Sequence, residues 1–319
     1  MALATLSRLL LDLHTLEASP SLAQFREQVL KRLSESVPFT SAVWASGAMT
    51  PGGPDFHTVT LWKQPPQLLV DYEAIKHQDP LFVESAQSPG RAVRASARTS
   101  LPPSFMPFVA RYRLEQAMSI MHTDPRSLLL TGLSLWRSSP TEPFTAEDAG
   151  LMEAAFPHLM EVSAKRLLAD LGRFGSAPAP VSSLAAVDRR GRLHAADARF
   201  VSVLTREFPR WRGPELPGAL HPALATGSAQ RVVLTHITAT ITPHGDLIAV
   251  RVRARSAVDD LTPRQLEVVE LGALGLNHKQ IAQRLAVSPT TVRNHLAHAY
   301  DRLGVGNRVE LATLLQRLR

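Results

Sequence analysis

The chain has 319 residues, of which 45% are hydrophobic and 20% charged, and it contains no cysteine. This length favours roughly two or three hydrophobic cores, and the composition excludes disordered, collagen-like and disulfide-stabilised classes as well as cysteine-based catalysis. The net charge of +7 is uneven, at −2 over residues 1–170, +6 over 171–259 and +3 over 260–319, so the basic C-terminal half favours nucleic acid, an acidic partner or a membrane surface as its binding target.

No apolar run approaches the roughly 20 residues that a membrane-spanning helix needs, so we expect a soluble, cytoplasmic protein. Segments rich in glycine, proline and small residues indicate linkers. The predicted linkers are residues 172–180 and 256–260, and the domains that they separate are residues 1–171, 181–255 and 261–319.

The first domain is predicted to be mixed α and β. Apolar residues at the helical period predict a helix over Ser21–Ser36, and a longer apolar helix is expected over Ala146–Leu171. Between them, short strands are expected at Ser41–Ala45, Phe56–Trp62 and Ser127–Trp136. This order of elements is similar to that of GAF-like sensor domains, which implies an α/β domain that holds a small ligand.

One segment of this domain, DYEAIKHQDPLFVESAQSPGRAV at residues 71–93, resembles the part of quorum-sensing regulators that lines the acyl-homoserine-lactone pocket. The resemblance implies Tyr72 and Asp79 at a ligand amide, although Leu68 and Val93 stand near where those regulators carry tryptophans. A different small apolar or amphipathic ligand, or none, also fits, and Asp79 before Pro80 equally fits a helix cap. The aromatic residues that we name as candidate cavity lining, or else ordinary core, are Trp44, Trp62, Tyr112 and Trp136.

The second domain is predicted to be a small sheet with one helix. The expected elements are a strand at Ala185–Val187, a turn at Asp188–Gly191, a helix at Asp197–Glu207 and a hairpin turned at Pro243–Asp246. The stretch VDRRGRLHAADARFVSVLTREFP resembles the start of a PAS-type sensor domain, which implies haem, flavin, a small ligand or dimerisation. The histidines of this segment, His194, His221, His236 and His244, do not single out a haem ligand, and we expect a spacer or dimerisation role and no cofactor.

The third domain is predicted to be all-α with four helices. Thr262 with Gln265 forms a capping pair ahead of the first helix, Asn277 caps the second, and Ser288 before Pro289 starts the third. A turn of three residues separates the second helix from the third. On the third helix an apolar stripe lies opposite a polar face, which is the pattern of a helix-turn-helix; the stripe consists of Val292, Leu296, Ala299 and Leu303.

The segments LTPRQLEVVELGALG, NHKQIAQRLAVSPTTVRNHLAHAYDRLGV and NRVELATLL resemble the LuxR-type, or GerE-type, helix-turn-helix of bacterial transcription regulators. The resemblance places the third helix in the major groove of double-stranded DNA. It implies base-facing positions at Arg293, Asn294 and Ala297, flanked by His298, and positions near phosphates at Lys279, Ser288, Thr290, Thr291 and His295. Gln265 and Gly272 depart from the usual family residues, as does the short Ala297.

The sequence therefore predicts a bacterial transcriptional regulator that binds an inverted repeat as a homodimer, with Leu311, Leu314 and Leu315 of the last helix as a candidate dimer contact. An enzyme is not expected, because a phosphate-binding GxxxxGK[ST] and an HExxH metal site are absent and GLSLW at Gly132–Trp136 lacks the last glycine of a nucleophile elbow. His295 and His298 lack a third metal ligand nearby. The alternative function is a signalling adaptor whose helical module docks a protein partner.

Overall fold

The computed structural model describes residues 2–16, 21–51, 53–172 and 183–318. It contains two five-stranded sheets and a helical C-terminal segment, which confirms the predicted mixed α/β class. The chain divides into two compact units, the first made of Met1–Asp170, Ala186–Ala196 and Arg212–Leu216, and the second of Leu171–Ala185, Asp197–Trp211 and Pro217–Arg319. Most of the first predicted linker, residues 173–180, lies outside the described residues.

The first sheet has the strand order β2-β1-β5-β4-β3, with antiparallel neighbours throughout. Its strands are β1 (Ser41–Thr50), β2 (Gly53–Trp62), β3 (Val93–Ser96), β4 (Gln116–Thr123) and β5 (Leu129–Arg137). The strands expected near β1, β2 and β5 are confirmed, and each has different ends from those expected. Strands β3 and β4 were not predicted, because β3 is short and the burial of β4 on both faces hides the alternation of a half-exposed strand.

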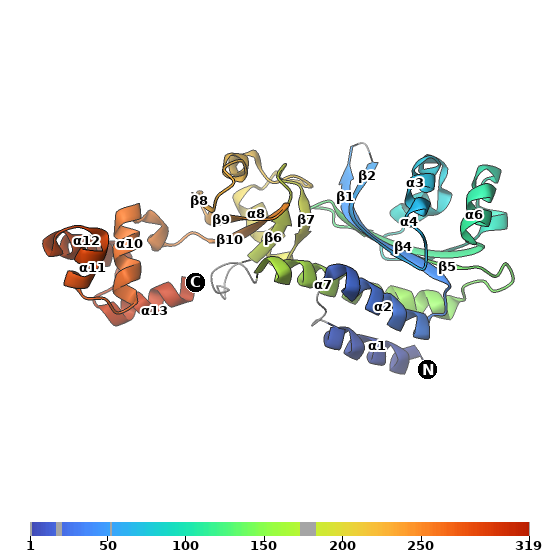
Figure 1. Ribbon diagram of the computed structural model, residues 1–319, viewed down its shortest axis with the longest axis horizontal. Helices are drawn as coiled ribbons and strands as arrows, with labels where there is room; N and C mark the ends of the chain where they lie inside the picture. The colour runs from blue at the N-terminus through green and yellow to red at the C-terminus, as the bar shows by residue number, and fades with distance from the viewer. Residues whose placement is uncertain (1, 17–20, 52, 173–182, 319) are drawn as a thin grey trace. The chain divides into compact units, whose positions relative to one another are not determined.

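Helices cover both faces of this sheet (Figure 1). On one face lie α2 (Leu22–Ser36) and α7 (Ala146–Gly172), with α1 (Ala2–Leu16) packed against α2 on the side away from the sheet. On the other face lie α3 (Gln67–Glu73), α4 (Pro80–Gln87) and α6 (Met106–Tyr112), and α5 (Ala97–Ser100) follows β3. The main core lies on the α2 and α7 side, where Trp44, Met118 and Leu133 are fully buried. Helix α2 starts where predicted, since the Ser21 hydroxyl accepts a hydrogen bond from the Gln24 N–H at 3.3 Å.

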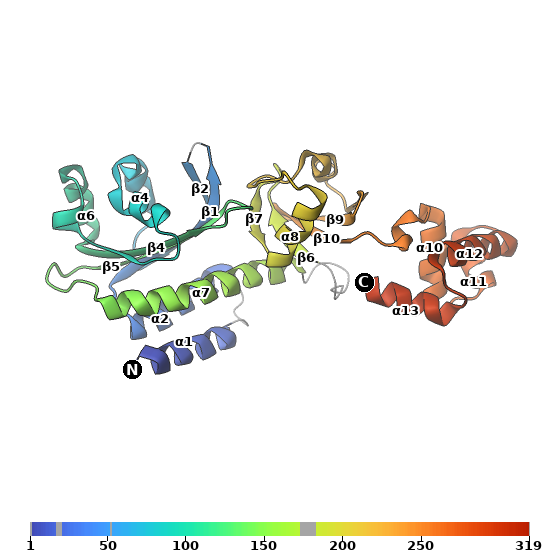
Figure 2. The same cartoon turned by 180° about the vertical axis from the view of Figure 1, so that it is seen from behind.

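The second sheet has the order β7-β6-β10-β9-β8 and carries helix α8 (Figure 2). Its elements are β6 (Ser183–Val187), β7 (Leu193–Ala196), α8 (Ala198–Glu207), α9 (His221–Leu224), β8 (Gln230–Val233), β9 (Ile237–His244) and β10 (Leu247–Ala254). Asp197 caps α8, with its carboxylate accepting from the Phe200 N–H at 2.6 Å. The predicted helix and terminal hairpin are thus confirmed, with Gly245 supplying the positive φ of the hairpin turn.

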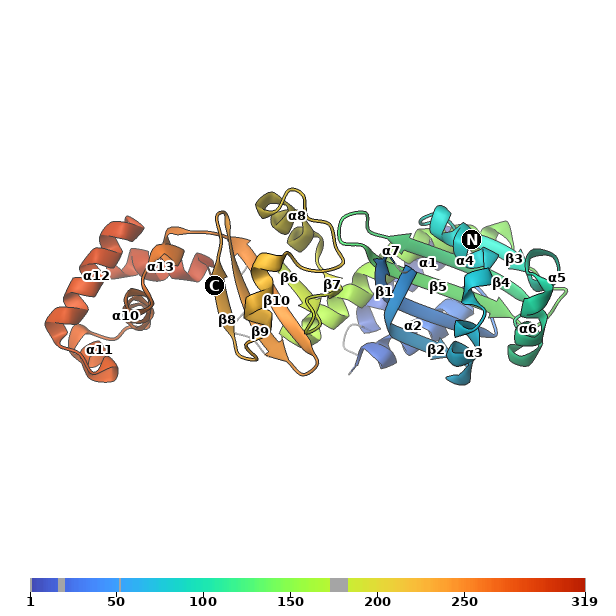
Figure 3. The same ribbon diagram turned by 90° about the horizontal axis from the view of Figure 1, so that it is seen from above.

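The C-terminal helices are α10 (Pro263–Ala273), α11 (His278–Leu285), α12 (Pro289–Leu303) and α13 (Arg308–Leu318), and they are seen together in Figure 3. A one-turn 3-10 helix, η4 (Ala257–Asp260), precedes them. They enclose a core to which Val268, Ile281 and Leu296 contribute. All four predicted helices are confirmed. No helix among the described residues combines the length and the apolar character needed to cross a lipid bilayer.

Two histidines of the first unit form a stacked pair. The rings of His57 and His194 lie 3.8 Å apart between centroids, and His57 Nε2 is buried without a hydrogen-bond partner. Burial lowers the pKa of His57 to about 3, with the positive charges of His194, Arg26 and Arg192 acting in the same direction. The folded chain therefore keeps His57 neutral at pH values where a histidine in the unfolded chain, with a pKa near 6.5, takes up a proton.

Acidification is expected to destabilise the first unit through His57. A lowered histidine pKa costs no stability above about pH 6.5 and progressively more below it, which amounts to roughly 2 kcal/mol by pH 5. In urea unfolding at pH 7.5 and pH 5, the His57→Gln variant should lose less stability between the two pH values than the parent chain. His298→Gln, on the exposed face of α12, is the control and should follow the parent. Equal pH dependence of the His57 variant and the parent would contradict this assignment.

Candidate functional site

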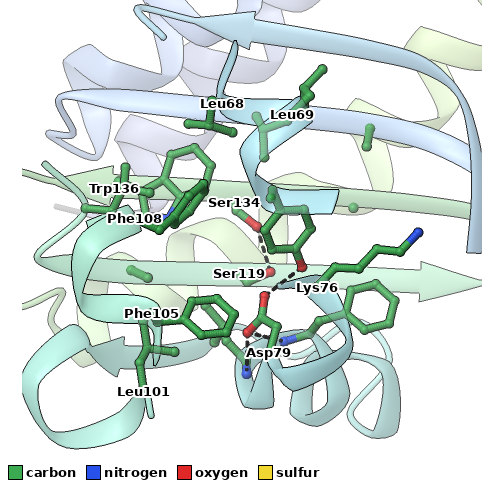
Figure 4. A pocket seen from close by; sticks show the side chains of 18 of the residues that line it. Leu68, Leu69, Lys76, Asp79, Leu101, Phe105, Phe108, Ser119, Ser134 and Trp136 are labelled. Atoms are coloured by element: carbon green, nitrogen blue, oxygen red, sulfur yellow. Dashed lines mark hydrogen bonds between the residues drawn. The ribbon is translucent and has the colours of Figure 1, made fainter. Parts of the chain in front are cut away.

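An apolar cavity of about 270 Å³ lies on the face of the first sheet that α3, α4 and α6 cover (Figure 4). Strands alternate their side chains between faces, so the residues next to the buried core positions face this cavity: Val43 beside Trp44, and Ser119 beside Met118. From the covering helices, Leu68, Leu69, Phe105, Phe108 and Val109 complete a mostly hydrocarbon wall. This is the composition of a site for a small apolar or amphipathic molecule.

Tyr72 and Asp79 form a hydrogen-bonded pair on the wall of this cavity. The Tyr72 hydroxyl donates to Asp79 Oδ2 at 2.7 Å, and Asp79 Oδ1 accepts from the N–H groups of Leu81 and Phe82 at 2.9 and 3.2 Å as the cap of α4. Burial raises the pKa of Tyr72, and the neighbouring Asp79 carboxylate adds to this. Both interpretations of Asp79 are thus compatible, since one carboxylate caps a helix and also lines the cavity.

A second polar pair lies on the floor of the cavity. Ser119 of β4 and Ser134 of β5 stand directly opposite each other, with their hydroxyl oxygens 2.9 Å apart. Ser134 belongs to the GLSLW segment and is a strand residue, as expected once the nucleophile elbow was excluded. The two hydroxyls are able to donate to or accept from a ligand, because each has hydrogen-bonding capacity beyond their mutual contact.

The structure places only some of the cavity-lining candidates named from the sequence at the cavity. Trp136, Tyr72 and Asp79 line the cavity, whereas Trp44 lies in the core on the opposite face of the sheet. Trp62 packs against that same core with its ring 4.9 Å from Phe39, and the Tyr112 hydroxyl donates to Asp71 at 2.6 Å instead of reaching the cavity wall. Aromatic identity alone therefore did not tell which face of the sheet a residue occupies.

Several lining residues were missed by the sequence interpretation. Ser119 could be assigned to the cavity only by predicting strand β4, which was not predicted. Phe105, Phe108 and Val109 come from the α5 to α6 segment, for which no element was predicted. An available signal was the polar Ser119 between Met118 and Ile120, since the period of a strand places it on the face opposite to these two apolar neighbours. Lys76 and Glu73 add charged groups to the lining.

The second candidate site is the outer face of α12. The cap and turn residues that fix its position act as predicted: Asn277 and Gln280 exchange hydrogen bonds at 2.9 and 3.0 Å, and the Ser288 hydroxyl accepts from the Thr291 N–H at 3.0 Å. Between α11 and α12, Ala286 takes a left-handed conformation with φ of 51°. Arg264 donates to the Leu285 carbonyl at 2.6 Å and so joins α10 to the end of α11.

Most of the side chains proposed to contact DNA are accessible. The exposed members are Lys279, Ser288, Thr290, Arg293, Asn294, Ala297 and His298, while Thr291 and His295 are half-buried. Opposite them, Val292, Leu296 and Ala299 are buried in the domain core. The helix is therefore amphipathic in the sense predicted, with most of its polar residues exposed and its apolar residues buried. Among the residues that the structure describes, no group of three metal-ligating side chains is present.

The last helix uses its leucines differently from the expectation. Leu311 and Leu315 are buried in the core of their own domain, and Leu314 packs against it partly buried. Arg308 fixes the start of α13 by donating to the carbonyls of Gly272 and Leu276 at 2.6 and 3.2 Å. Leu311 and Leu315 therefore contribute to the core of their own domain, and only Leu314 of the three keeps part of its surface exposed.

Comparisons with known proteins agree with this geometry. Residues 259–315 match the family model described as bacterial regulatory proteins of the luxR family. An HTH-type transcriptional regulator of Mycobacterium tuberculosis (strain H37Rv) is 53% identical over 51 residues, which are 16% of this chain and 6% of that protein. The nitrate/nitrite response regulator protein NarL of Escherichia coli (strain K12) is 35% identical over 98 residues, 31% of this chain and 43% of NarL. The matches thus cover less than half of these relatives.

Among solved structures, the N-acylhomoserine-lactone-dependent LuxR-family transcription factor CepR2 from Burkholderia cenocepacia aligns over 52% of this chain and 98% of its own, with 21% identity and a TM-score of 0.41. Escherichia coli SdiA in complex with octanoyl-rac-glycerol aligns over 98% and 94%, with 13% identity and a TM-score of 0.42. Residues 259–315 are a LuxR-type helix-turn-helix domain.

Loss of the Asp79 carboxylate is expected to destabilise the wall of the cavity. Asp79→Ala removes the α4 cap and the acceptor of Tyr72, which should lower the free energy of unfolding by about 1–3 kcal/mol. Asp79→Asn keeps an amide oxygen for the cap and should lose less than about 1 kcal/mol. Urea unfolding followed by tryptophan fluorescence measures both, with Tyr72→Phe isolating the hydroxyl contribution. Equal losses for the alanine and asparagine variants would contradict the capping role.

Proposed function

We propose that this protein is a DNA-binding transcriptional regulator controlled by a small molecule in the cavity of its first unit. The observation that carries the proposal is the LuxR-type domain whose α12 exposes Arg293 and Asn294 on a polar face. Arginine is suited to a guanine edge and asparagine to an adenine edge in the major groove. Lys279 and Thr290 stand where phosphate contacts orient the helix.

A homodimer on an inverted repeat is part of the proposal. One helix-turn-helix buries too little surface for high affinity, and paired half-sites about one helical turn apart compensate for this. Because Leu311 and Leu315 serve their own domain core, we place the dimer contact elsewhere and assign no residues to it. The protein would act in the cytoplasm, where bacterial DNA lies.

The proposed ligand is small and apolar or amphipathic. The cavity wall is mostly hydrocarbon, and its polar groups are already paired, Tyr72 with Asp79, Ser119 with Ser134 and Lys76 with Glu73. A ligand that buries an apolar body and presents one or two polar groups fits this wall better than a charged one, because burial of an unpaired charge is costly. CepR2 is named as dependent on an N-acylhomoserine lactone and SdiA was solved with octanoyl-rac-glycerol, and both compounds belong to this broad class.

Binding to the DNA upstream of the protein's own gene tests the regulator hypothesis. In gel shifts, Arg293→Ala should bind the specific site about 5- to 150-fold more weakly, the equivalent of about 1–3 kcal/mol, and lose little on random DNA. Lys279→Ala should weaken binding to both DNAs. It should also reduce the slope of the logarithm of the binding constant against the logarithm of the salt concentration by about 1. Arg32→Ala, an exposed arginine of α2, is the matched control. No shift with any tested DNA would favour the adaptor alternative.

Mass spectrometry under native and denaturing conditions tests the ligand and the dimer in one measurement. We expect a native mass of two chains plus additional mass that disappears on denaturation, since a molecule held in an apolar cavity survives gentle ionisation only while the fold is intact. Ser134→Leu, which adds bulk to the cavity floor without charge, is expected to reduce the bound mass. A bare monomer that binds the specific DNA with full affinity would contradict the dimer, and bound mass unchanged in Ser134→Leu would place the ligand elsewhere.

A further inference from the structure

A buried arginine lies on the face of the first sheet opposite to the apolar cavity. Arg26 of α2 is only 2% exposed, and its guanidinium lies between β1 and α7. The groups that accept its hydrogen bonds are all uncharged: the Ser163 hydroxyl at 3.2 Å from Nε and 3.1 Å from Nη2, the Ser46 hydroxyl at 2.7 Å from Nη2, and the Trp44 carbonyl at 3.4 Å from Nη1. The charge also lies over the Trp44 ring, 4.9 Å from its centroid.

No carboxylate of the described residues forms an ion pair with Arg26, whereas Arg32 of the same helix pairs with Asp12 and Glu35. Burial lowers the pKa of Arg26 to about 10, so the side chain remains protonated at neutral pH. Its positive charge contributes to the low pKa of His57. A buried cation without a counter-charge is costly, and proteins normally compensate it with an anion.

A small cavity beside this guanidinium offers room for such an anion. Its volume is about 70 Å³, several times the roughly 10–15 Å³ that one water molecule needs. The polar residues on its wall are all able to donate hydrogen bonds, and neither aspartate nor glutamate is among them: Arg26, Ser46, Thr58, Thr131, Ser163 and His194.

The serine hydroxyls make this wall complementary to an oxyanion. Ser46 and Ser163 use oxygen lone pairs to accept from Arg26, which leaves each O–H hydrogen free to donate. An anion in the cavity would therefore receive a charge-assisted contact from Arg26 and neutral hydrogen bonds from both serines. We propose that the cavity at Arg26, Ser46 and Ser163 binds a small oxyanion of the size of phosphate, which supplies a counter-charge that no described residue provides between α2, β1 and α7.

Phosphate binding at this site is separable from the ligand cavity and from the DNA-binding face. Ser119 and Ser134 lie on the other side of the sheet, and Arg293 lies in the LuxR-type domain. Failure of the regulator hypothesis would therefore leave this proposal standing, and the reverse also holds.

The test titrates inorganic phosphate into the full-length protein at constant ionic strength, set with sodium chloride, and follows the melting temperature and the ³¹P line width. We expect saturable stabilisation and line broadening in the parent chain. Arg26→Gln should weaken phosphate binding at least tenfold, whereas Arg32→Gln, which replaces an exposed arginine of the same helix, should bind as the parent does. Arg293→Ala should also bind as the parent does, which excludes the DNA-binding face as the source.

Thr131→Val provides a variant that keeps the buried arginine and its contacts. Thr131 lines the cavity, and its loss should weaken phosphate binding several-fold while the fold is retained, even if Arg26→Gln does not fold. A parallel titration with acetate shows whether the cavity accepts a carboxylate as well as a phosphate. Saturable binding of either anion that is weakened by Thr131→Val supports the proposal. Absence of saturable binding of both anions to the parent chain, or binding unchanged in Thr131→Val and Arg26→Gln, would overturn it and leave Arg26 as a purely structural cation.

Discussion

The alternation of side chains across strands β1, β4 and β5 is the constraint on which the first unit depends. The same three strands provide Trp44, Met118 and Leu133 to the core under α2 and α7, and their sequence neighbours to the apolar cavity under α3, α4 and α6. A shift of one residue in register would exchange these two sets. The register is therefore fixed by burial of large residues on one side, which leaves smaller residues such as Gly132 and Ser134 for the other side. Space for a ligand is a consequence of this division of residue sizes.

The polar groups of the cavity also follow from structural requirements. Asp79 is held by its role as the cap of α4, and Tyr72 is held by Asp79. A side chain fixed in this way loses no further conformational freedom when a ligand arrives, which is the condition for a preorganised site. The arrangement also limits what binds there, because a ligand must share an acceptor that is already engaged or use the remaining capacity of the two serines. An apolar body with few polar atoms satisfies this condition.

The local signals in the sequence predicted more of the fold than of the sites. Asp197 and Asn277 lie at the helix starts that they indicated, because capping depends only on residues within one turn. The cavity depends on contacts between segments far apart in the chain, and neither the aromatic character of Trp44 nor the position of Leu311 contains that information. Strand β4 is buried on both faces, so its sequence lacked the alternation that identifies a half-exposed strand. The buried charge of Arg26 was hidden because its neighbours, Ser46 and Ser163, are distant in sequence.

Net charge was the least specific of the sequence signals. Two of the arginines of residues 171–259 are engaged internally, since Arg231 and Arg253 both donate to the fully buried carboxylate of Asp259. Burial opposes ionisation of Asp259, but hydrogen bonds from Arg253, the Ser256 backbone and Arg231 outweigh it and hold the pKa of Asp259 well below its usual range. Nucleic-acid affinity therefore cannot be credited to these arginines. The proposed function assigns it to the LuxR-type domain, whose helix α12 exposes Arg293 and Arg302 beside the acidic Asp301. In the proposed homodimer, two such domains would bind the DNA together and so add their electrostatic contributions.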